Sequence, residues 1–251
     1  GLGDVYKRQL EFQERGKEQL RSYGAQIVNA TVDSVTDNDR TLTATLSNGE
    51  TIAARSIIVA SGVDDEHPAI PGLQENWGNT VLHCPYCHGY EVADKKLGVL
   101  YIGEFSFHHA AVLRQWSKDI TFFTNGMEFT DEQRADLTRR GIALIDGPVT
   151  AFRDGKVLLE SDEHAVDALF YMPIPRPHDE FLADLNLKRH SPPPAMGGSL
   201  IEADLTGATS HPRVWAVGNV VNPGAQVAMA MGQANAAAIA VNGFLVEDDW
   251  I

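Results

Sequence analysis

The chain has 251 residues, 43% of them hydrophobic and 22% charged, which are ordinary values for globular domains and enough for a large core. This composition excludes disorder, collagen-like repeats and coiled coil as descriptions of the whole chain. The formal net charge of −14 argues against nucleic acid or an anionic membrane surface as the binding partner.

The first part of the chain predicts one helix followed by strands. A charged helix over residues 10–23 ends at Gly24, a residue type common just past a helix C-terminus. Asn48-Gly49 has the composition of a two-residue hairpin turn. The apolar run that ends in Ser61-Gly62 predicts a strand buried on both faces. The strands expected here are residues 27–35, 41–46, 51–54 and 56–60.

The first nine residues, GLGDVYKRQ, join abruptly onto this helix and carry no initiating Met. The stretch resembles a translated sequencing-adapter scar, so we expect residues 1–9 to be non-native and exclude them from the fold prediction. We also expect the native N-terminus to be missing. A loop rich in proline and glycine over residues 68–78 then indicates a crossing into another domain.

The middle of the chain predicts a second α/β unit. Strand, helix and strand over residues 97–102, 108–118 and 120–124 make one βαβ motif. Thr130 and Gln133 form the capping-box pattern of a further helix that ends at Gly141. The other strands expected in this unit are residues 142–145, 149–152, 157–160 and 169–173, and a turn at Asp154-Gly155 joins 149–152 to 157–160 as a small antiparallel meander. After it, a strand over residues 213–217 leads into an Ala-rich helix. The predicted fold is therefore α/β, with one Rossmann-like unit inserted between the pieces of another.

The Ala-rich helix, residues 227–246, is the longest apolar candidate. Gln233, Asn235 and Asn242 interrupt it, and a span of the bilayer needs roughly 20 consecutive apolar residues. We therefore predict a buried core helix and no membrane partner.

The chain contains two cysteines, Cys84 and Cys87, arranged as Cys-Pro-Tyr-Cys between His83 and His88. No signal peptide is visible, so we expect a cytoplasmic protein, in which such a pair indicates redox chemistry or a metal. A zinc site is disfavoured because both histidines adjoin the thiols, whereas structural zinc takes its ligands from two separated pairs. A thioredoxin- or glutaredoxin-like helix is disfavoured because Gly89 follows almost at once. The third reading is the redox centre of a flavoprotein.

Four motifs in order carry a resemblance that favours this third reading. They are SIIVASG at 56–62, IPG with WG at 70–78, CPYCHGYE at 84–91, and VWAVGNVVNPGAQVAMAMGQANAAA at 214–238. Together they resemble the low-molecular-weight thioredoxin reductase family of FAD- and NAD(P)-dependent disulfide oxidoreductases. The resemblance implies two interleaved Rossmann-like domains: residues 10–67 and 199–251 as the remaining FAD-binding domain, and residues 68–198 as the inserted domain that carries the cysteines.

The resemblance also implies roles for the motif residues. Cys87 is expected to lie against the flavin ring, and Cys84 to attack a partner disulfide by thiol–disulfide exchange. The family has Asp after the second cysteine as the acid–base group. Here His88 stands in that position, and histidine suits the task near neutral pH. The alternative is that His88 is only a polar loop residue.

The FAD contacts implied by the resemblance fall in two places. Gly218 and Asn219 stand where the family has Gly-Asp beside the ribityl chain, and asparagine keeps an acceptor oxygen without the charge. The N-terminus of the last helix would face the electron-rich edge of the flavin; the alternative is an ordinary helix start against a core. The other expected contacts are Ser61, Gly62, Gly224, Ala225 and Gln226.

Two departures from the family pattern bear on cofactor binding, one on FAD and one on NADP(H). No Gly-x-Gly-x-x-Gly precedes the flavin motifs, so we expect the polypeptide as given to bind FAD poorly. In the inserted domain only Gly103 remains of the nucleotide-binding glycines, and Thr124-Asn125-Gly126 replaces the family's His-Arg-Arg. Without cations for the 2′-phosphate, the sequence argues against NADP(H) as cofactor.

This pattern looks like the dithiol oxidases of natural-product pathways, in which a cysteine pair oxidises a dithiol and reduced flavin passes electrons to oxygen. The alternatives are a conventional NAD(P)H-dependent thioredoxin reductase and a binding module that has lost its chemistry. The expected partner is a thioredoxin-like protein or a small dithiol or disulfide, with no metal site, and the family implies a homodimer.

Overall fold

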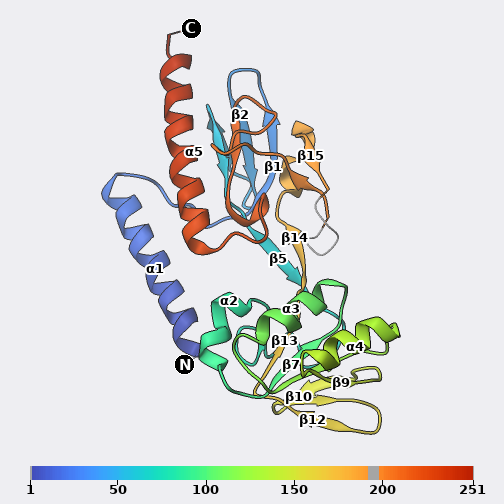
Figure 1. Ribbon diagram of the computed structural model, residues 1–251. Helices are drawn as coiled ribbons and strands as arrows, with labels where there is room; N and C mark the ends of the chain where they lie inside the picture. The colour runs from blue at the N-terminus through green and yellow to red at the C-terminus, as the bar shows by residue number, and fades with distance from the viewer. Residues whose placement is uncertain (1, 192–197, 251) are drawn as a thin grey trace. The chain divides into compact units, whose positions relative to one another are not determined.

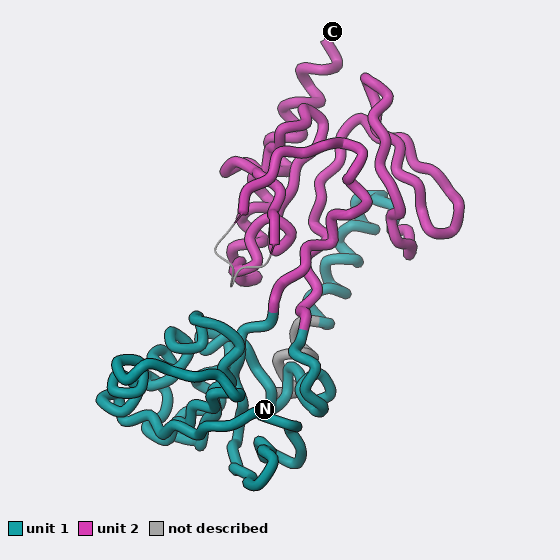
Figure 2. The backbone as a smooth tube through the Cα atoms, turned by 90° about the vertical axis from the view of Figure 1, so that its right-hand side faces the viewer, with its two compact units in different colours: residues 1–27, 67–173 teal, residues 28–66, 174–251 magenta. Residues whose placement is uncertain are grey.

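The structure is a computed structural model that describes residues 2–191 and 198–250. The chain forms two compact units, each built from two separate segments (Figure 2). Residues 1–27 and 67–173 form the first unit, and residues 28–66 and 174–251 form the second. Each unit has its own sheets and its own buried clusters, as described below.

The first unit is organised by a five-stranded sheet in which every neighbouring pair is parallel. The strand order is β6-β13-β7-β8-β9, so the last strand in the sequence lies between the first two. This arrangement confirms the predicted βαβ motif, since β7 and β8 are joined through helix α3. The strands are β6 (Val81–Leu82), β7 (Leu97–Leu100), β8 (Ile120–Phe123), β9 (Ala143–Ile145) and β13 (Ala168–Phe170).

Both faces of this sheet are buried. One face packs against helices α3 (Phe105–Leu113) and α4 (Asp131–Arg139), where Leu97 and Val99 meet Leu113 (Figure 1). The other face packs against a small antiparallel sheet through Leu100. The alternation along β7 follows from the two-residue period of a strand. The small sheet comprises β10 (Ala151–Arg153), β11 (Lys156–Leu158) and β12 (Glu163–Ala165).

The turn and cap chemistry of this unit agrees with the sequence prediction. The Thr130 hydroxyl accepts the Gln133 N–H at 3.2 Å, and the Gln133 side chain accepts the Thr130 N–H at 2.9 Å, which completes the capping box of α4. Asp154 and Gly155 have φ angles of 52° and 71°, which suits the turn between β10 and β11. The third strand of this meander, β12, was absent from the prediction.

The second unit contains a three-stranded antiparallel sheet and three two-stranded sheets. Strand β4 pairs in parallel with β17, β5 pairs with β14, and β15 pairs with β16. A cluster that includes Val35, Leu42 and Val214 is buried between these elements. The strands are β1 (Val32–Asp37), β2 (Leu42–Leu46), β3 (Thr51–Ala54), β4 (Ile57–Val59), β5 (Val63–Glu66), β14 (Ile174–Pro177), β15 (Arg189–His190), β16 (Leu200–Ile201) and β17 (Val214–Ala216).

The unit boundaries differ from those predicted. Residues 174–198, expected in the inserted domain, fall in the second unit because β14 pairs with β5 along four residues. Helix α1 (Leu2–Ser22) is grouped with the first unit, although residues 10–23 were expected in the flavin-binding domain. The helix includes residues 2–9, and their proposed non-native origin stays a prediction. The strand expected over residues 27–35 begins only at Val32, since residues 25–31 have no strand partner.

Two burial predictions are wrong. In β4, Ile58 is 40% exposed, because among the described strands β4 pairs only with β17 and its second face is uncovered. The Ala-rich helix α5 (Val227–Asp248) buries only Ala237 among its described residues, in a cluster with Trp215 and Val217. By length and composition alone this helix would be able to cross a membrane, and the expectation of no membrane partner stays a prediction.

Short helices complete the fold and lie at the candidate sites. Helix α2 (Pro85–His88) runs directly into the 3₁₀ turn η1 (Gly89–Val92) in the first unit. In the second unit, η2 (Glu180–Leu185) packs against β1, and η4 (Gly218–Val220) follows β17.

Candidate functional site

The two cysteines form a disulfide on the first turn of α2. Their Cα atoms are 5.3 Å apart, and Cys84 is the N-cap residue whose sulfur accepts the Cys87 N–H at 3.2 Å. Pro85 is buried at the first helical position, where its missing N–H costs nothing. Cys84 is half-buried and Cys87 is exposed. The thiols are thus engaged with each other, as a redox-active pair requires, rather than offered as metal ligands.

His88 lies at the end of α2, one residue beyond the disulfide. Its Nδ1 is 3.4 Å from Oε2 of Glu91, and its side chain is only 15% exposed. A carboxylate at this distance can orient the imidazole ring. The structure therefore gives His88 a partner of the kind that acid–base groups have, while its role toward the cysteines stays a prediction.

Gly89, which follows His88, is packed against an indole ring. A Cβ at this position would lie 2.4 Å from Nε1 of Trp116 and 2.5 Å from its Cδ1. The backbone of Gly89 is ordinary right-handed helix, with φ of −58°, so the need for glycine is steric rather than conformational. The sequence indicated only that Gly89 limits the length of the helix.

Aromatic rings support the residue that precedes the disulfide. His83 stacks on Trp77 with centroids 5.4 Å apart and planes at 20°. Trp77 also contacts His67 edge-on at 4.6 Å, and Nδ1 of His67 lies 2.7 Å from the hydroxyl of Tyr171. Tyr171 is fully buried. The chain enters Cys84 through a packed aromatic cluster, which limits its freedom to move.

A second histidine of this region, His109 on α3, is buried. Neither ring nitrogen makes a hydrogen bond of ordinary geometry to any residue that the structure describes. The pKa of His109 is lowered to about 4, chiefly by burial and in smaller part by His83 and His108, while the backbone of His83 acts in the opposite direction. Its ring contacts Phe105 edge-on at 5.4 Å. His109 is therefore neutral at physiological pH.

The loop at the carboxyl end of β7 is closed by its own chain. The Ser106 hydroxyl accepts the Ile102 N–H at 3.2 Å and donates to the Leu100 carbonyl at 3.3 Å. The Ser106 N–H is donated to the Gly103 carbonyl, and the Glu104 carboxylate accepts the Tyr101 hydroxyl. The N–H groups of Ile102 and Ser106 are thus bound within the loop, and the carboxylate of Glu104 beside them opposes the approach of a pyrophosphate. A Cβ at Gly103 would meet open space.

Asn125 occupies the next strand end of the same unit. Its Nδ2 donates to the Tyr101 carbonyl at 3.4 Å, and its Oδ1 accepts the Val149 N–H at 3.1 Å. The residue has a φ of 52°, a conformation that asparagine tolerates better than most residues. The amide thus ties two segments together at the position where the resembling family carries an arginine.

A cavity of about 360 Å³ in the second unit brings together several predicted FAD contacts. Gly62, Gly218, Asn219 and Ala225 line it, together with small and apolar side chains that directly follow β4 and β17 or lie on α5. Ser61, Gly224 and Gln226 are not among its lining residues, and their expected role stays a prediction. The further lining residues are Ala60, Val217, Val227, Ala230, Met231 and Ala234.

Backbone conformation keeps this cavity open. Gly62 and Gly218 have φ angles of 76° and 75°, which side chains rarely adopt. A Cβ at Gly62 would meet nothing within 4 Å, and one at Gly218 would meet only Ala230 at 3.8 Å. Two strand ends therefore present bare backbone to the cavity, an arrangement that allows close approach of a cofactor.

Asn219 organises the loop beside the cavity. Its Nδ2 is within 3.0 to 3.2 Å of the carbonyls of Asn222, Pro223 and Ala225. The sequence suggested only that asparagine keeps an acceptor; the structure shows that its donor end is used. An aspartate could not make these contacts, because it would place a carboxylate against three carbonyl oxygens.

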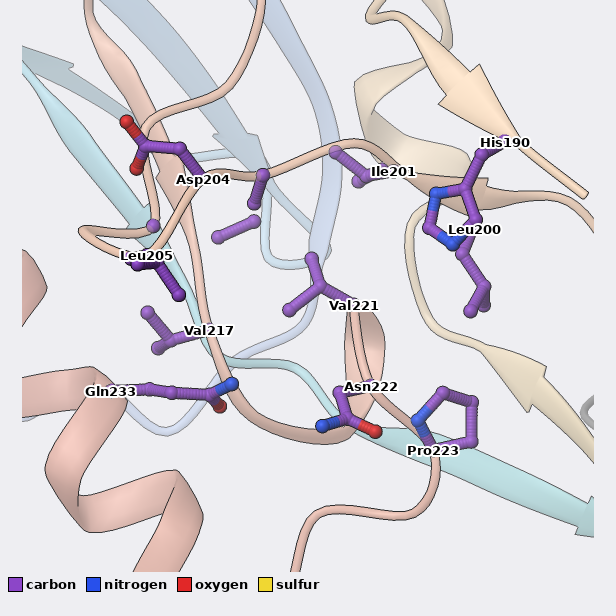
Figure 3. A pocket seen from close by; sticks show the side chains of 13 residues that line it. His190, Leu200, Ile201, Asp204, Leu205, Val217, Val221, Asn222, Pro223 and Gln233 are labelled. Atoms are coloured by element: carbon purple, nitrogen blue, oxygen red, sulfur yellow. The ribbon is translucent and has the colours of Figure 1, made fainter. Parts of the chain in front are cut away.

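A larger cavity of about 620 Å³ lies in the same unit and contains none of the predicted site residues (Figure 3). Its walls are mostly apolar, with polar groups from His190, Asp204, Asn222 and Gln233. The Gln233 side chain accepts the Gly218 N–H at 3.0 Å. Gln233, which the sequence treated as an interruption of an apolar helix, therefore supports the glycine that borders the smaller cavity.

Comparison with known proteins agrees with these features. The family model described as "Pyridine nucleotide-disulphide oxidoreductase" matches residues 4–234. The crystal structure of HlmI is 39% identical with a TM-score of 0.87, covering 95% of this chain and 76% of that one. An oxidoreductase from Agrobacterium tumefaciens is 31% identical with a TM-score of 0.87, covering 94% and 80%.

Among curated relatives, "Thioredoxin reductase tcpT" of Claviceps purpurea is 39% identical over 85 residues, 32% of this chain and 26% of that protein. The matched region thus spans about a quarter of that relative's length. The family-model match, in contrast, extends over nearly the whole chain and includes both the disulfide and the glycine-lined cavity. The chain belongs to the pyridine nucleotide-disulphide oxidoreductase family and is of its low-molecular-weight, thioredoxin reductase-like type.

Proposed function

We propose that this chain is the thiol–disulfide exchange part of an FAD-dependent oxidoreductase that works as a dithiol oxidase. The observation that carries the proposal is the contrast between the helix that bears the cysteine pair and the nucleotide loop after β7. The cysteine pair is joined as a disulfide on a partly exposed helix, whereas the nucleotide loop after β7 is closed by Ser106 and Glu104. The chain keeps the group that reacts with thiols and lacks a site suited to NADPH.

The residues of the smaller cavity suit a flavin. Gly62 and Gly218 give a ring or ribityl chain close access to the backbone, and Asn219 leaves its Oδ1 as an acceptor. Bound FAD would supply the electron acceptor for the reduced cysteine pair. The predicted weakness of FAD binding by the polypeptide as given stays a prediction, as do the homodimer and the cytoplasmic location.

The cysteine pair would react with a dithiol by two exchange steps. A substrate thiolate attacks one sulfur of the disulfide and forms a mixed disulfide, which frees the other cysteine as a thiolate. The second substrate thiolate then attacks the substrate sulfur of the mixed disulfide and displaces the bound cysteine, so the substrate leaves as a disulfide and both cysteines become thiols. Thiolates are the reactive species, and free thiols have a pKa of about 8.5. His88, paired with Glu91, is proposed to take up and return the proton.

A second candidate is a conventional thioredoxin reductase, the function named for the Claviceps relative. The two candidates differ in their electron donor. We expect an anaerobic FAD-loaded protein to keep its flavin oxidised with NADPH and to lose the flavin colour with a dithiol. Prompt bleaching by NADPH would contradict the oxidase proposal and support the reductase.

Exchange itself can be tested without flavin. Incubation with a dithiol, followed by alkylation and mass measurement, should trap two free thiols in the unchanged chain. Cys84→Ser should still fold but form no internal disulfide and release no oxidised substrate. If the unchanged chain retains its disulfide after exposure to dithiols, the exchange function is wrong.

A further inference from the structure

Two tyrosines beside the disulfide are exposed in residues 67–173, a segment that buries most of its large apolar side chains. Three large apolar side chains of this segment are more than half exposed: Tyr86 at 70%, Tyr90 at 83% and Met127 at 53%. Tyr86 lies between the cysteines, and Tyr90 follows in η1. Helix α1 of the same unit and Tyr23 just after it also expose apolar side chains, but within residues 67–173 both exposed tyrosines stand at the redox pair.

The helical segment that presents these rings is held in place. Gly89, directly before Tyr90, packs on the indole of Trp116, and Val92 at the end of η1 is buried in the sheet core. Cys87, on the same segment, is exposed. Tyrosine offers a large contact area at little cost in conformational entropy, since it has two side-chain torsions. A rigid backbone thus displays two rings next to a sulfur that solvent can reach.

We propose that Tyr86 and Tyr90 form an aromatic surface that binds the ring of a small, uncharged, ring-bearing dithiol while it exchanges with the Cys84–Cys87 disulfide. This inference rests on the proposed thiol–disulfide exchange and names the substrate feature that the site selects. Tyr86 and Tyr90 are specificity-determining residues in this account, and the cysteines remain the reacting groups.

The extent of the surface favours a small molecule over a protein. One aromatic side chain buries about 150–250 Å², so two offer at most about 500 Å². A stable protein interface takes about 800 Å² from each partner. The neighbouring side chains are polar, with Glu91 31% and His88 15% exposed. The carboxylate of Glu91 and the net charge of −14 disfavour an acidic ligand.

The reaction needs no further reactant. The dithiol loses two electrons and two protons as its sulfurs join, and the disulfide between Cys84 and Cys87 gains both as it opens to two thiols. Stacking on the tyrosines would hold the substrate ring while its two thiols react in turn, which raises the effective concentration of the second thiol. The expected effect is therefore on the rate of exchange with ring-bearing dithiols in particular.

The test compares two dithiols that both close to six-membered cyclic disulfides. One is 1,2-benzenedimethanethiol, which carries an aromatic ring, and the other is dithiothreitol, which does not. For the whole chain, the rate of Cys84–Cys87 reduction is followed by alkylation and mass measurement, and the ratio of the two rates is recorded. Comparing this ratio between variants cancels the intrinsic reactivities of the probes.

We expect Tyr86→Ala and Tyr90→Ala each to lower the ratio by about threefold to tenfold, in line with the strength of aromatic pairs. Tyr86→Phe and Tyr90→Phe should retain it, because the ring remains. Met127→Ala is the matched control, since it removes an exposed apolar side chain of the same unit from another segment, and it should leave the ratio unchanged.

The outcomes separate this inference from the proposed function. If neither dithiol reduces the disulfide of the unchanged chain, the exchange function fails. If both dithiols reduce the disulfide but the alanine variants keep the rate ratio of the unchanged chain, the proposed tyrosine surface is wrong and the exchange function is unaffected. Reduced thioredoxin is the third probe: alanine variants that slow it, while leaving the aromatic dithiol unaffected, would show a protein-docking surface and overturn the proposal.

Discussion

Replacing His109 should reduce the loss of folding stability that the first unit suffers at acidic pH. The imidazole is buried and its pKa is lowered from 6.5 to about 4 by burial, with His83 and His108 as the nearby titratable groups. Between these two pH values the His109 imidazole is protonated in the unfolded chain and neutral in the folded chain. The free energy of unfolding therefore decreases as the pH falls from 6.5 toward 4. Above pH 6.5 the imidazole is neutral in both states, and this loss of stability is absent.

The size of the effect follows from the shift. A difference of one pKa unit corresponds to about 1.4 kcal/mol, so the full loss by pH 4 is about 3 kcal/mol and the loss at pH 5 is about 2 kcal/mol. His109→Leu removes the titrating group and leaves a side chain of similar volume. Because neither ring nitrogen makes a hydrogen bond of ordinary geometry to a described residue, the replacement should cost little at pH 8.

The assay is urea unfolding of the whole chain at pH 8 and pH 5, followed by tryptophan fluorescence. His109→Leu should unfold at a higher urea concentration than the unchanged chain at pH 5 and at a similar one at pH 8. His108→Leu is the matched control, because that neighbouring side chain is exposed. Equal pH dependence in the His109 variant and the unchanged chain would refute the reasoning, as would an imidazole that titrates near 6.5 by NMR.

Two further substitutions test steric and hydrogen-bonding claims. Gly89→Ala forces a Cβ to within 2.4 Å of the Trp116 ring and should cost about 1–3 kcal/mol of stability, whereas Gly103→Ala, whose Cβ meets open space, should cost less than about 1 kcal/mol. Thermal unfolding of both variants checks this, and equal melting temperatures would contradict it. Asn219→Asp should loosen the loop at 222–225 and speed its amide hydrogen exchange more than Asn219→Ala does, because a carboxylate repels the three carbonyls that the amide binds. Slower exchange in the Asp variant than in the Ala variant would reject that account.

The sequence predicted the elements whose evidence is local. The capping box of α4 and the turn at Asp154-Gly155 depend on residues within one turn of the chain, and both are confirmed. The βαβ motif around α3 depends on one run of alternating hydrophobicity and was also predicted. Each of these features is decided before distant parts of the chain meet, so pattern and propensity suffice to identify it.

The features that the sequence missed depend on distant partners. Strand β13 lies between β6 and β7, a placement that no local pattern contains. The pairing of β5 with β14 joins residues more than a hundred positions apart, and its polar, proline-containing strands carry no alternation, which explains why the boundary between the compact units after residue 173 differs from the domain boundary predicted after residue 198. Ile58 is apolar but exposed, because burial depends on what covers a strand and not on its composition.

The site shows the same division. The cysteine pair and its flanking His88 are visible in the sequence, since spacing alone identifies a redox motif. The exposure of Tyr86 and Tyr90 is not, because tyrosine occurs both inside and outside folded domains. The burial of His109 is likewise not visible in the sequence, since the α3 sequence FSFHHAAVL has no clear apolar face.

Two asparagines stand where the resembling family has charged residues, and both use their amides on the main chain. Asn125 replaces an arginine and binds the Tyr101 carbonyl and the Val149 N–H, while Asn219 replaces an aspartate and donates to loop carbonyls. At each position the family's charge is thus replaced by an amide whose hydrogen bonds to the main chain the charged residue could not make. Arginine at position 125 would lack the acceptor oxygen that binds Val149 and would be strained at a φ of 52°. Restoring that one charge would therefore disturb the strand end before it created a phosphate site, and the carboxylate of Glu104 in the loop after β7 would still oppose a phosphate.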